Sequence, residues 1–300
     1  TLKPIDHKTY CFIGDGCLME GISHEAMSLA GVLELNKLIC FYDSNGISID
    51  GEIKGWYKDD IRLRCESYNW NVIGEIDGHN RDQINEAIIA AKESNKPTMI
   101  VCKTSIGYGA GSKQDSESSH GAPLGEDALD ELRKNLKWSY EPFEIPKSVY
   151  EDWDFKEKGK TLEKNWKEIC REHEKEDPEK ARLLKRLASG DLPEGFFQAF
   201  DNHIGDLQGN TDSVATRKCS QMVLEFLKEE LPELVGGSAD LSGSNNTITK
   251  SSIAINSDSS GNYIYYGVRE FGMNAVMNGM SLHGGIIPYG GTFLVFMDYG

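Results

Sequence analysis

The residues of this sequence that could do chemistry by type and spacing begin with one carboxylate and one amide. Asp15 lies in Gly14-Asp15-Gly16 after one apolar run, and Asn45 lies in Asn45-Gly46 after another, 30 positions further on. One βαβ unit spans about 30 residues, so both side chains are expected at the carboxyl ends of neighbouring parallel strands. Carboxylate and amide oxygens suit Mg²⁺ or Ca²⁺, with phosphate oxygens completing the shell.

The same residues also have a plain structural interpretation. Asp15 could cap a helix that begins near Ile22, and Asn45-Gly46 could be an ordinary turn. The glycines favour the chemical interpretation, because they let a diphosphate approach backbone N–H groups closely. Spacing alone does not separate these two alternatives.

The apolar pattern predicts the elements that would position these side chains. The expected order is strand 9–13, helix 22–33, strand 38–42, strand 70–73, helix 84–91 and strand 99–102. This alternation predicts an α/β domain with a mostly parallel sheet flanked by helices.

The second half of the chain begins a new α/β rhythm after a long charged stretch. A Gly- and Ser-rich loop at 107–125 contains His120, and residues 151–187 form a charged stretch that Pro178 interrupts. We expect two polar helices there, bridging two domains. From Thr216 onward a helix, a strand ending near 236–240, a strand at 263–266 and a helix at 270–282 are predicted.

Composition narrows the function classes. The 300 residues carry a formal net charge of -16, which argues against nucleic-acid binding because such a field repels a phosphate backbone. No apolar run approaches the ~20 residues of a membrane span. The seven cysteines are scattered without a Cys-x-x-Cys pair, which gives a zinc or redox site little support and favours a reducing cytoplasm.

Five blocks, in order along the chain, closely resemble the motifs of transketolases, which use thiamine diphosphate. They are Gly14–Ala26, Asp43–Gly51, Ser119–Gly125, Gly236–Leu241 and Tyr266–Gly272. One departure is Ser44, where many relatives have Asn or Asp before the metal-binding Asn. The resemblance implies the thiamine diphosphate-binding fold, a homodimer and the pentose phosphate pathway.

The resemblance also implies a domain organisation. Residues 1–145 would form the diphosphate-binding domain, 146–212 the charged helical linker, and 213–300 the start of the pyrimidine-binding domain. Both outer domains are expected to lack part of their sequence, so the chain is interpreted as a central fragment. We expect the fragment alone to be inactive.

The resemblance assigns roles to individual residues. Asp15, Asn45 and the backbone carbonyl of Ile47 would hold Mg²⁺, with Ca²⁺ or Mn²⁺ as alternatives. The implied cofactor-binding residues are Gly16, Asn45, His120, Asp240, Glu270, Phe293, Phe296 and Tyr299. The implied residues for sugar phosphate binding are His120, Arg217 and Ser244.

Glu270 and His120 would be the catalytic residues. Glu270 matches the family glutamate that contacts the pyrimidine N1′ atom, a role that requires a protonated carboxyl near neutral pH. Its expected place near a helix start favours the ionised form instead. An apolar pocket and a second carboxylate could offset this effect, and Glu20 resembles the glutamate that meets the catalytic one across the dimer interface.

The implied reaction is the transfer of a two-carbon ketol unit from a ketose phosphate to an aldose phosphate. Deoxyxylulose phosphate synthase, phosphoketolase and dihydroxyacetone synthase are related alternatives. Two features, the block that contains His120 and the separate residue Arg217, favour transketolase over deoxyxylulose phosphate synthase and phosphoketolase. Dihydroxyacetone synthase stays an open alternative. A non-catalytic relative is a further alternative, against which Asp15, Asn45 and Glu270 argue.

Overall fold

A computed structural model describes residues 3–209, 213–256 and 260–300 of the chain. The chain divides into two compact units, Thr1–Arg171 and Glu172–Gly300. This division falls inside the stretch that the sequence assigns to the linker. The domain limits of 1–145, 146–212 and 213–300 stay predictions.

A four-stranded sheet forms the centre of the first unit. The strands are β1 (Thr9–Gly14), β2 (Leu38–Ser44), β5 (Asn71–Asp77) and β6 (Thr98–Lys103). Their order is β1-β2-β6-β5, and every pairing is parallel. Gly14 lies opposite Asp43 in the register, so the ends of β1 and β2 lie side by side. The predicted βαβ units and the parallel sheet are confirmed.

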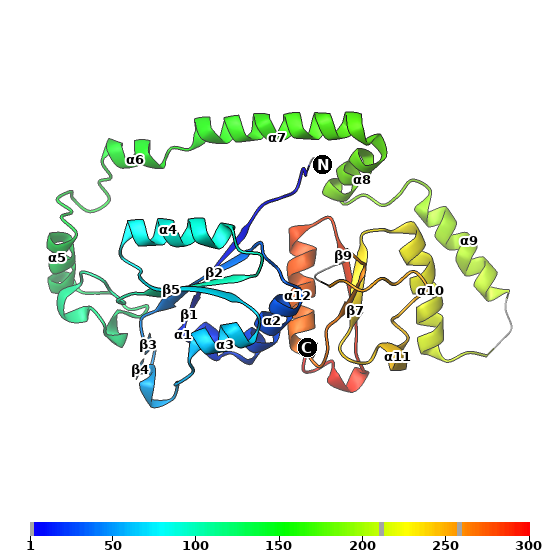
Figure 1. Ribbon diagram of the computed structural model, residues 1–300, viewed down its shortest axis with the longest axis horizontal. Helices are drawn as coiled ribbons and strands as arrows, with labels where there is room; N and C mark the ends of the chain where they lie inside the picture. Colours follow the sequence, from blue (N-terminus) through cyan, green and yellow to red (C-terminus); the bar gives the residue numbers. More distant parts are fainter. Residues whose placement is uncertain (1–2, 210–212, 257–259) are drawn as a thin grey trace. The chain divides into compact units, whose positions relative to one another are not determined.

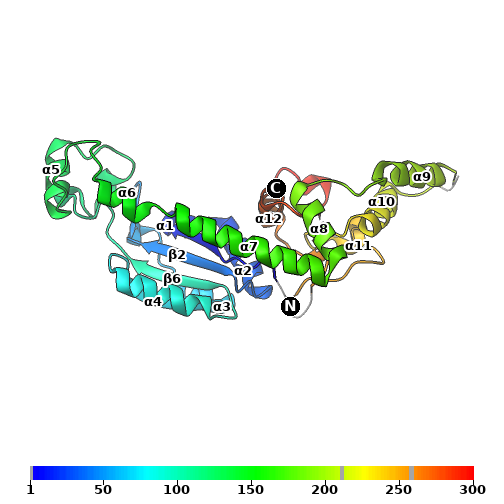
Figure 2. The same ribbon diagram turned by 90° about the horizontal axis from the view of Figure 1, so that it is seen from above.

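Helices cover both faces of this sheet. Helix α4 (Arg81–Lys92) lies on one face, and α1 (Asp15–Met19), α2 (Gly21–Val32) and α3 (Ile61–Ser67) lie on the other (Figures 1 and 2). Asn80 caps α4 through its side-chain oxygen, which accepts from the backbone N–H groups of Asp82 and Gln83. Such a cap is worth about 1 kcal/mol.

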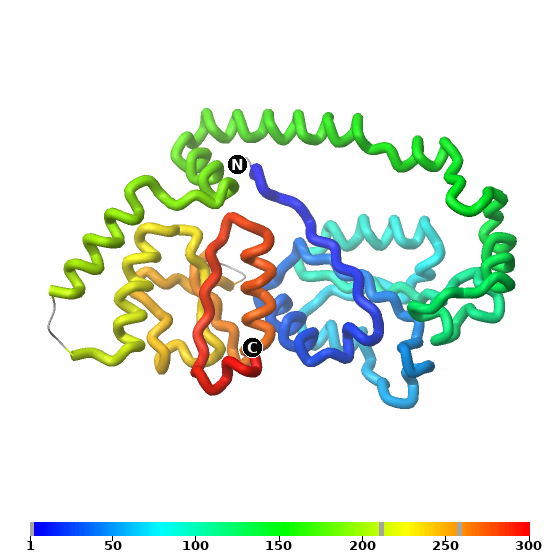
Figure 3. Tube along the Cα trace, turned by 180° about the vertical axis from the view of Figure 1, so that it is seen from behind, coloured from blue at the N-terminus to red at the C-terminus, as the bar shows by residue number. Residues whose placement is uncertain are grey.

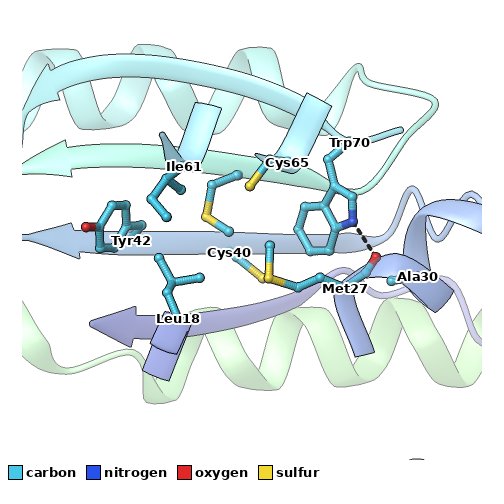
Figure 4. Close-up of a cluster of buried hydrophobic side chains, with 9 residues drawn as sticks. Leu18, Met27, Ala30, Cys40, Tyr42, Ile61, Cys65 and Trp70 are labelled. Atoms are coloured by element: carbon cyan, nitrogen blue, oxygen red, sulfur yellow. Dashed lines mark hydrogen bonds between the residues drawn. The ribbon is translucent and has the colours of Figure 1, made fainter. Parts of the chain in front are cut away.

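The alternation of side chains along β2 builds two cores. Ile39 and Phe41 pack towards α4, whereas Cys40 and Tyr42 belong to the cluster beneath α1, α2 and α3 (Figure 4). Strands that are covered by helices on both faces carry continuous apolar runs, which explains why residues 38–42 are apolar without interruption. Trp70 closes the second cluster by donating from Nε1 to the carbonyl of Met27 at 2.8 Å.

A short helix that the predicted order of elements does not contain follows β1 directly. Helix α1 begins at Asp15 itself, and α2 begins after Glu20 without a side-chain cap. Asp15 therefore does not cap the helix near Ile22, and the plain structural interpretation of this residue was wrong. The local reason is the extended backbone of Glu20, which separates the two helices.

The remainder of the first unit holds short elements and long polar helices. They are β3 (Ile47–Ser48), β4 (Gly51–Glu52), α5 (Glu126–Asn135), α6 (Lys147–Trp153) and α7 (Lys156–Glu176), the last of which continues past the division between units. Helix α7 buries no residue in the described structure. Pro178 opens the next helix after the Asp177 cap, so it separates two polar helices as predicted.

The second unit repeats the α/β plan with three parallel strands in the order β8-β7-β9. Helix α12 runs beside β9 (Figure 3). The strands are β7 (Leu234–Ser238), β8 (Tyr263–Tyr265) and β9 (Ile287–Gly291). The helices are α8 (Pro178–Ser189), α9 (Phe196–Gln208), α10 (Thr216–Glu230), α11 (Ser242–Asn245) and α12 (Glu270–His283).

One ion pair ties α8 to this sheet. The guanidinium of Arg186 donates to both oxygens of Glu233, at 2.6 and 2.9 Å, and Glu233 is buried just before β7. Burial alone would raise the pKa of Glu233, but the two hydrogen bonds from Arg186 hold it below its ordinary value.

Among the helices of the described residues, none combines the length and apolar character of a membrane span.

Gly31 lets α2 approach the end of α3 closely. A Cβ atom at this position would lie 1.6 Å from the backbone carbonyl oxygen of Tyr68. We expect Gly31→Ala to lower the free energy of unfolding by about 1–3 kcal/mol or more, because backbone must move to relieve the overlap. Gly21→Ala is the matched control, since nothing lies within 4 Å of its Cβ position. Equal urea denaturation curves for the two variants would contradict this account.

Lys228 is buried in the second unit without a carboxylate partner in the described structure. Its Nζ atom donates to Ser252 and Asn262 at 3.0 and 3.3 Å and lies over the rings of Tyr263 and Tyr289. The side chain is only 6% exposed, and burial lowers its pKa to about 8.

The lowered pKa of Lys228 predicts a pH-dependent stability. Between about pH 8 and pH 10 the unfolded chain binds more protons than the folded one, so the free energy of unfolding rises with pH. The gain is on the order of 2–3 kcal/mol. Lys228→Met should remove this rise, whereas Lys218→Met, at an exposed site on the same helix, should keep it. Urea titrations from pH 7 to pH 10 measure the slope, and parallel slopes for wild type and Lys228→Met would refute the prediction.

Candidate functional site

The carboxylate of Asp15 is buried at the junction of β1 and α1. Its side chain is 3% exposed, because Asp15 directly follows the apolar strand β1 and begins a helix that contacts β2. The hydroxyl of Tyr42 donates to Oδ1, and the backbone N–H of Gly46 donates to Oδ2 at 2.9 Å. Burial, together with the hydrogen bond to Asp15, raises the pKa of Tyr42, so its hydroxyl stays a donor.

Asn45 is held in the turn that follows β2. Its Oδ1 accepts from the backbone N–H of Ile47 at 2.9 Å, and its Nδ2 lies 3.4 Å from Oδ2 of Asp43. The hydroxyl of Thr104, at the end of β6, donates to the other oxygen of Asp43. Gly46 has φ +75°, a conformation that glycine adopts without strain, and this turn brings its N–H back to Asp15.

Asp15, Asp43, Asn45 and Ile47 are among the residues that line a pocket of about 730 Å³ at the carboxyl ends of the strands. The structure therefore brings together five of the predicted site residues, namely Asp15, Gly16, Asn45, Ile47 and His120. Ligands of open parallel sheets bind at such strand ends. His120 reaches the pocket from the loop after β6, and its ring is exposed.

The donor set of this pocket fits a hard cation with a diphosphate. No ion pair between Asp15 and Lys, Arg or His is found in the described part of the chain. Buried charges are normally paired or bound to a metal, and two hydrogen bonds leave lone pairs of this carboxylate available. In the described residues, no three or more His, Cys, Asp or Glu side chains lie together so that they could hold a metal ion. Any cation in this pocket therefore needs amide and carbonyl oxygens or phosphate as ligands as well.

The backbone of the pocket is open where a phosphate would approach. Nothing lies within 4 Å of the Cβ positions of Gly14 and Gly16, which both line the pocket. A diphosphate could therefore reach their backbone groups closely. The residues present fit both parts of a metal–diphosphate cofactor.

Sequence reasoning missed several pocket residues, including Ser105, Ile106 and Ile49. The backbone N–H of Ser105 donates to Nε2 of His79 at 3.0 Å, and the ring of His79 stacks on Tyr108 at 3.9 Å. His79 thus holds the loop after β6 in place. Only the position of these residues after a predicted strand could have indicated them.

The second unit has its own pocket, of about 670 Å³, which is lined by residues of α10, α11 and β9 and of the segment after β9. Arg217, at the start of α10, Ser244, in α11, and Phe293 line it together. Ser238 organises this edge, because its hydroxyl donates to the carbonyl of Gly291 and accepts from Nδ2 of Asn245, both at 2.9 Å. The guanidinium of Arg217 is exposed and suits a phosphate group.

The other predicted residues of the second unit lie outside the lining of this pocket. Glu270 is the first residue of α12 and is 8% exposed. Asp240 is exposed after β7, with φ +60°. The rings of Phe293 and Phe296 are nearly parallel, with centroids 6.2 Å apart, and Tyr299 packs near Phe271. Their roles stay predictions.

Glu20 lies in the first unit, where it precedes α2. Its side chain is exposed, in contrast to that of Asp15. The structure therefore leaves this carboxylate accessible to another molecule. Its expected place near a subunit interface stays a prediction.

Two family models match this chain. The first, "Transketolase, thiamine diphosphate binding domain", matches residues 1–193, and the second, "Transketolase, pyrimidine binding domain", matches residues 212–300. Together they cover nearly all of the described residues. The first places thiamine diphosphate binding in the part of the chain that holds Asp15 and Asn45.

Curated relatives agree with these models. The chain is 53% identical to transketolase 1 of Pasteurella multocida over 298 residues, which cover 98% of the chain and 45% of that relative. It is 51% identical to transketolase 2 of Escherichia coli, with 98% and 44% covered. The chain thus spans less than half the length of these relatives.

Solved structures show the same fold. A transketolase from Leishmania mexicana superposes with a TM-score of 0.90 at 37% identity, covering 100% of this chain and 44% of that one. A Pichia stipitis transketolase in complex with sedoheptulose 7-phosphate gives 0.91 at 38% identity, covering 99% and 45%. The predicted α/β fold with parallel sheets is confirmed.

The carboxylate of Asp15, which has no ion pair in the described residues, leads to a prediction about ligand-dependent stability. In the intact protein, Mg²⁺ with thiamine diphosphate should raise the melting temperature, since a ligand that binds only the folded state stabilises it. Asp15→Asn should abolish this rise. Asp82→Asn, an exposed carboxylate change in α4, should leave it unchanged. Differential scanning fluorimetry measures the shift, and a full shift for Asp15→Asn would exclude Asp15 as a metal ligand.

Proposed function

The chain belongs to the transketolase family, and on this premise we propose that the intact protein transfers a two-carbon ketol unit from a ketose phosphate to an aldose phosphate. One observation carries the proposal. Asp15, Asn45, Ile47 and His120 line a single pocket at the carboxyl ends of parallel strands, although they come from separate segments of the sequence.

Thiamine diphosphate is the cofactor, and we propose Mg²⁺ as its metal. Bound thiamine diphosphate supplies a carbon nucleophile and an electron sink for breaking a carbon–carbon bond beside a carbonyl. Asp15 and Asn45 would hold the cation through side-chain oxygens, and Ile47 through its backbone carbonyl. Ca²⁺ and Mn²⁺, which share the preference for oxygen ligands, are the alternatives to test.

The pocket of the second unit supports a sugar phosphate as substrate. Arg217 can meet a phosphate bidentately, and the hydroxyl of Ser244 lines the same hollow. Solved structures of Pichia stipitis transketolase include a complex with sedoheptulose 7-phosphate and a complex of a variant with fructose 6-phosphate. His120 would stabilise developing charge on the sugar oxygen.

Glu270 would hold a proton at the pyrimidine N1′ atom of the cofactor. The carboxyl is buried at the first residue of α12, as a group that meets an enclosed part of a cofactor would be. Phe293 and Phe296 would contact the pyrimidine ring, which suits their parallel arrangement, and Tyr299 would lie beside it. Asp240 would lie near the thiazolium ring.

The proposal includes a homodimer in the cytoplasm. Two copies would complete each other's cofactor sites, with Glu20 near the interface. The exposed position of Glu20 supports this arrangement. All seven cysteines are free thiols, which supports a reducing compartment.

The test of this function is a two-stage measurement on the intact protein. Thiamine diphosphate binding should depend on Mg²⁺, and the loaded protein should transfer a ketol unit from xylulose 5-phosphate to ribose 5-phosphate. Binding without transfer to any aldose phosphate would favour a non-catalytic relative. Transfer to formaldehyde in preference to aldose phosphates would favour a dihydroxyacetone synthase.

Glu270→Gln tests the catalytic assignment. We expect kcat to fall by about 10²-fold or more, because an amide has no acidic proton to share with N1′. The affinity for thiamine diphosphate should change by much less. Glu229→Gln, at an exposed site on α10, should leave turnover unchanged. Full turnover of Glu270→Gln at saturating cofactor would remove Glu270 from the mechanism.

A further inference from the structure

Two donors from different parts of the first unit hold the carboxylate of Asp15. The backbone N–H of Gly46 occupies Oδ2, and the hydroxyl of Tyr42 occupies Oδ1. A carboxylate on a short helix could otherwise rotate about its side-chain bonds. Because each oxygen has its own donor, the plane of the carboxylate is determined by the protein before any cation binds.

Tyr42 is the more rigid of these two anchors. Its side chain is 5% exposed and packs in the cluster that includes Leu18 and Ile61. Figure 4 shows its hydroxyl directed towards the carboxyl ends of the strands, away from the rest of the cluster. The ring cannot turn away without disrupting the core, so the position of the hydroxyl oxygen is set by packing.

Asn45, the other side chain proposed to bind the cation, is held less firmly by the side chain of its neighbour Asp43. Asp43 contacts Asn45 only at 3.4 Å, and its side chain is exposed at the strand end. Ser44, the departure from many relatives, lies two residues after Tyr42 in β2. The contact between Tyr42 and Asp15 is therefore the one through which the core can control the cation site.

We propose that Tyr42 is a positioning residue that orients Asp15 for the cation and thereby sets the Mg²⁺ dependence of cofactor binding. The proposal rests on the function proposed above. Tyr42 does not line the pocket, so in this proposal it acts on the cation only through Asp15. Residues that orient a metal ligand by hydrogen bonding typically change metal affinity by about 10–100-fold when they are removed.

The test compares Tyr42→Phe with Tyr57→Phe in the intact protein. Tyr57 packs against the same cluster, but its hydroxyl accepts from Arg64 at 3.4 Å rather than donating to Asp15. Mg²⁺ is titrated at a fixed, saturating concentration of thiamine diphosphate, and binding is followed by calorimetry. Tyr42→Phe should raise the Mg²⁺ concentration for half-maximal binding at least tenfold, and Tyr57→Phe should change it by less than twofold.

Two further measurements separate positioning from general loss of structure. Saturating Mg²⁺ should restore both cofactor binding and kcat of Tyr42→Phe, because only orientation has been lost. Ile61→Val removes one methylene from the same cluster and should lower stability without moving the Mg²⁺ midpoint. An equal shift for Ile61→Val and Tyr42→Phe would overturn the proposal.

The outcomes distinguish this proposal from the function on which it rests. If the wild-type protein shows no Mg²⁺-dependent binding of thiamine diphosphate, the proposed function fails, and the role of Tyr42 fails with it. If the wild type binds and Tyr42→Phe has an unchanged Mg²⁺ midpoint, only the role of Tyr42 is wrong.

Discussion

The buried carboxylate of Asp15 is the constraint on which the first unit depends. A charge with 3% exposure and no ion pair in the described structure is costly unless donors and a cation compensate it. The fold provides the donors through the core residue Tyr42 and the turn residue Gly46. The stability of this unit and the proposed cation site therefore depend on the same side chain.

The parallel sheet converts separated sequence segments into one site. Strands β1, β2 and β6 end at the same edge, so the segments that follow them lie close together. The second unit uses the same device on a smaller sheet, where Ser238 holds the ends of β7 and β9. In both units the apolar strands contribute to the core, whereas the residues immediately after them lie at the sheet edge and are available to contact a ligand.

Net charge and local charge have different consequences in this protein. A formal charge of -16 repels an extended polyanion, yet it does not prevent binding of a small diphosphate or sugar phosphate. In the proposed function, a cation beside Asp15 and the open backbone near Gly16 would act on the diphosphate at short range, and the guanidinium of Arg217 would act in the same way on the sugar phosphate. At that range they outweigh the screened charges of distant helices such as α7.

The sequence by itself determined the βαβ order, the strand-end position of Asp15 and Asn45, and the motif order of the family, since apolar periodicity and turn residues are local. It did not indicate helix α1, the pocket residue Ile106 or the anchoring of Asp15 by Tyr42. In the sequence, residue 42 is one more apolar position in a buried strand. Only the tertiary structure decided that its hydroxyl meets a carboxylate 27 positions away, because strand register and core packing arise from contacts that no local pattern contains.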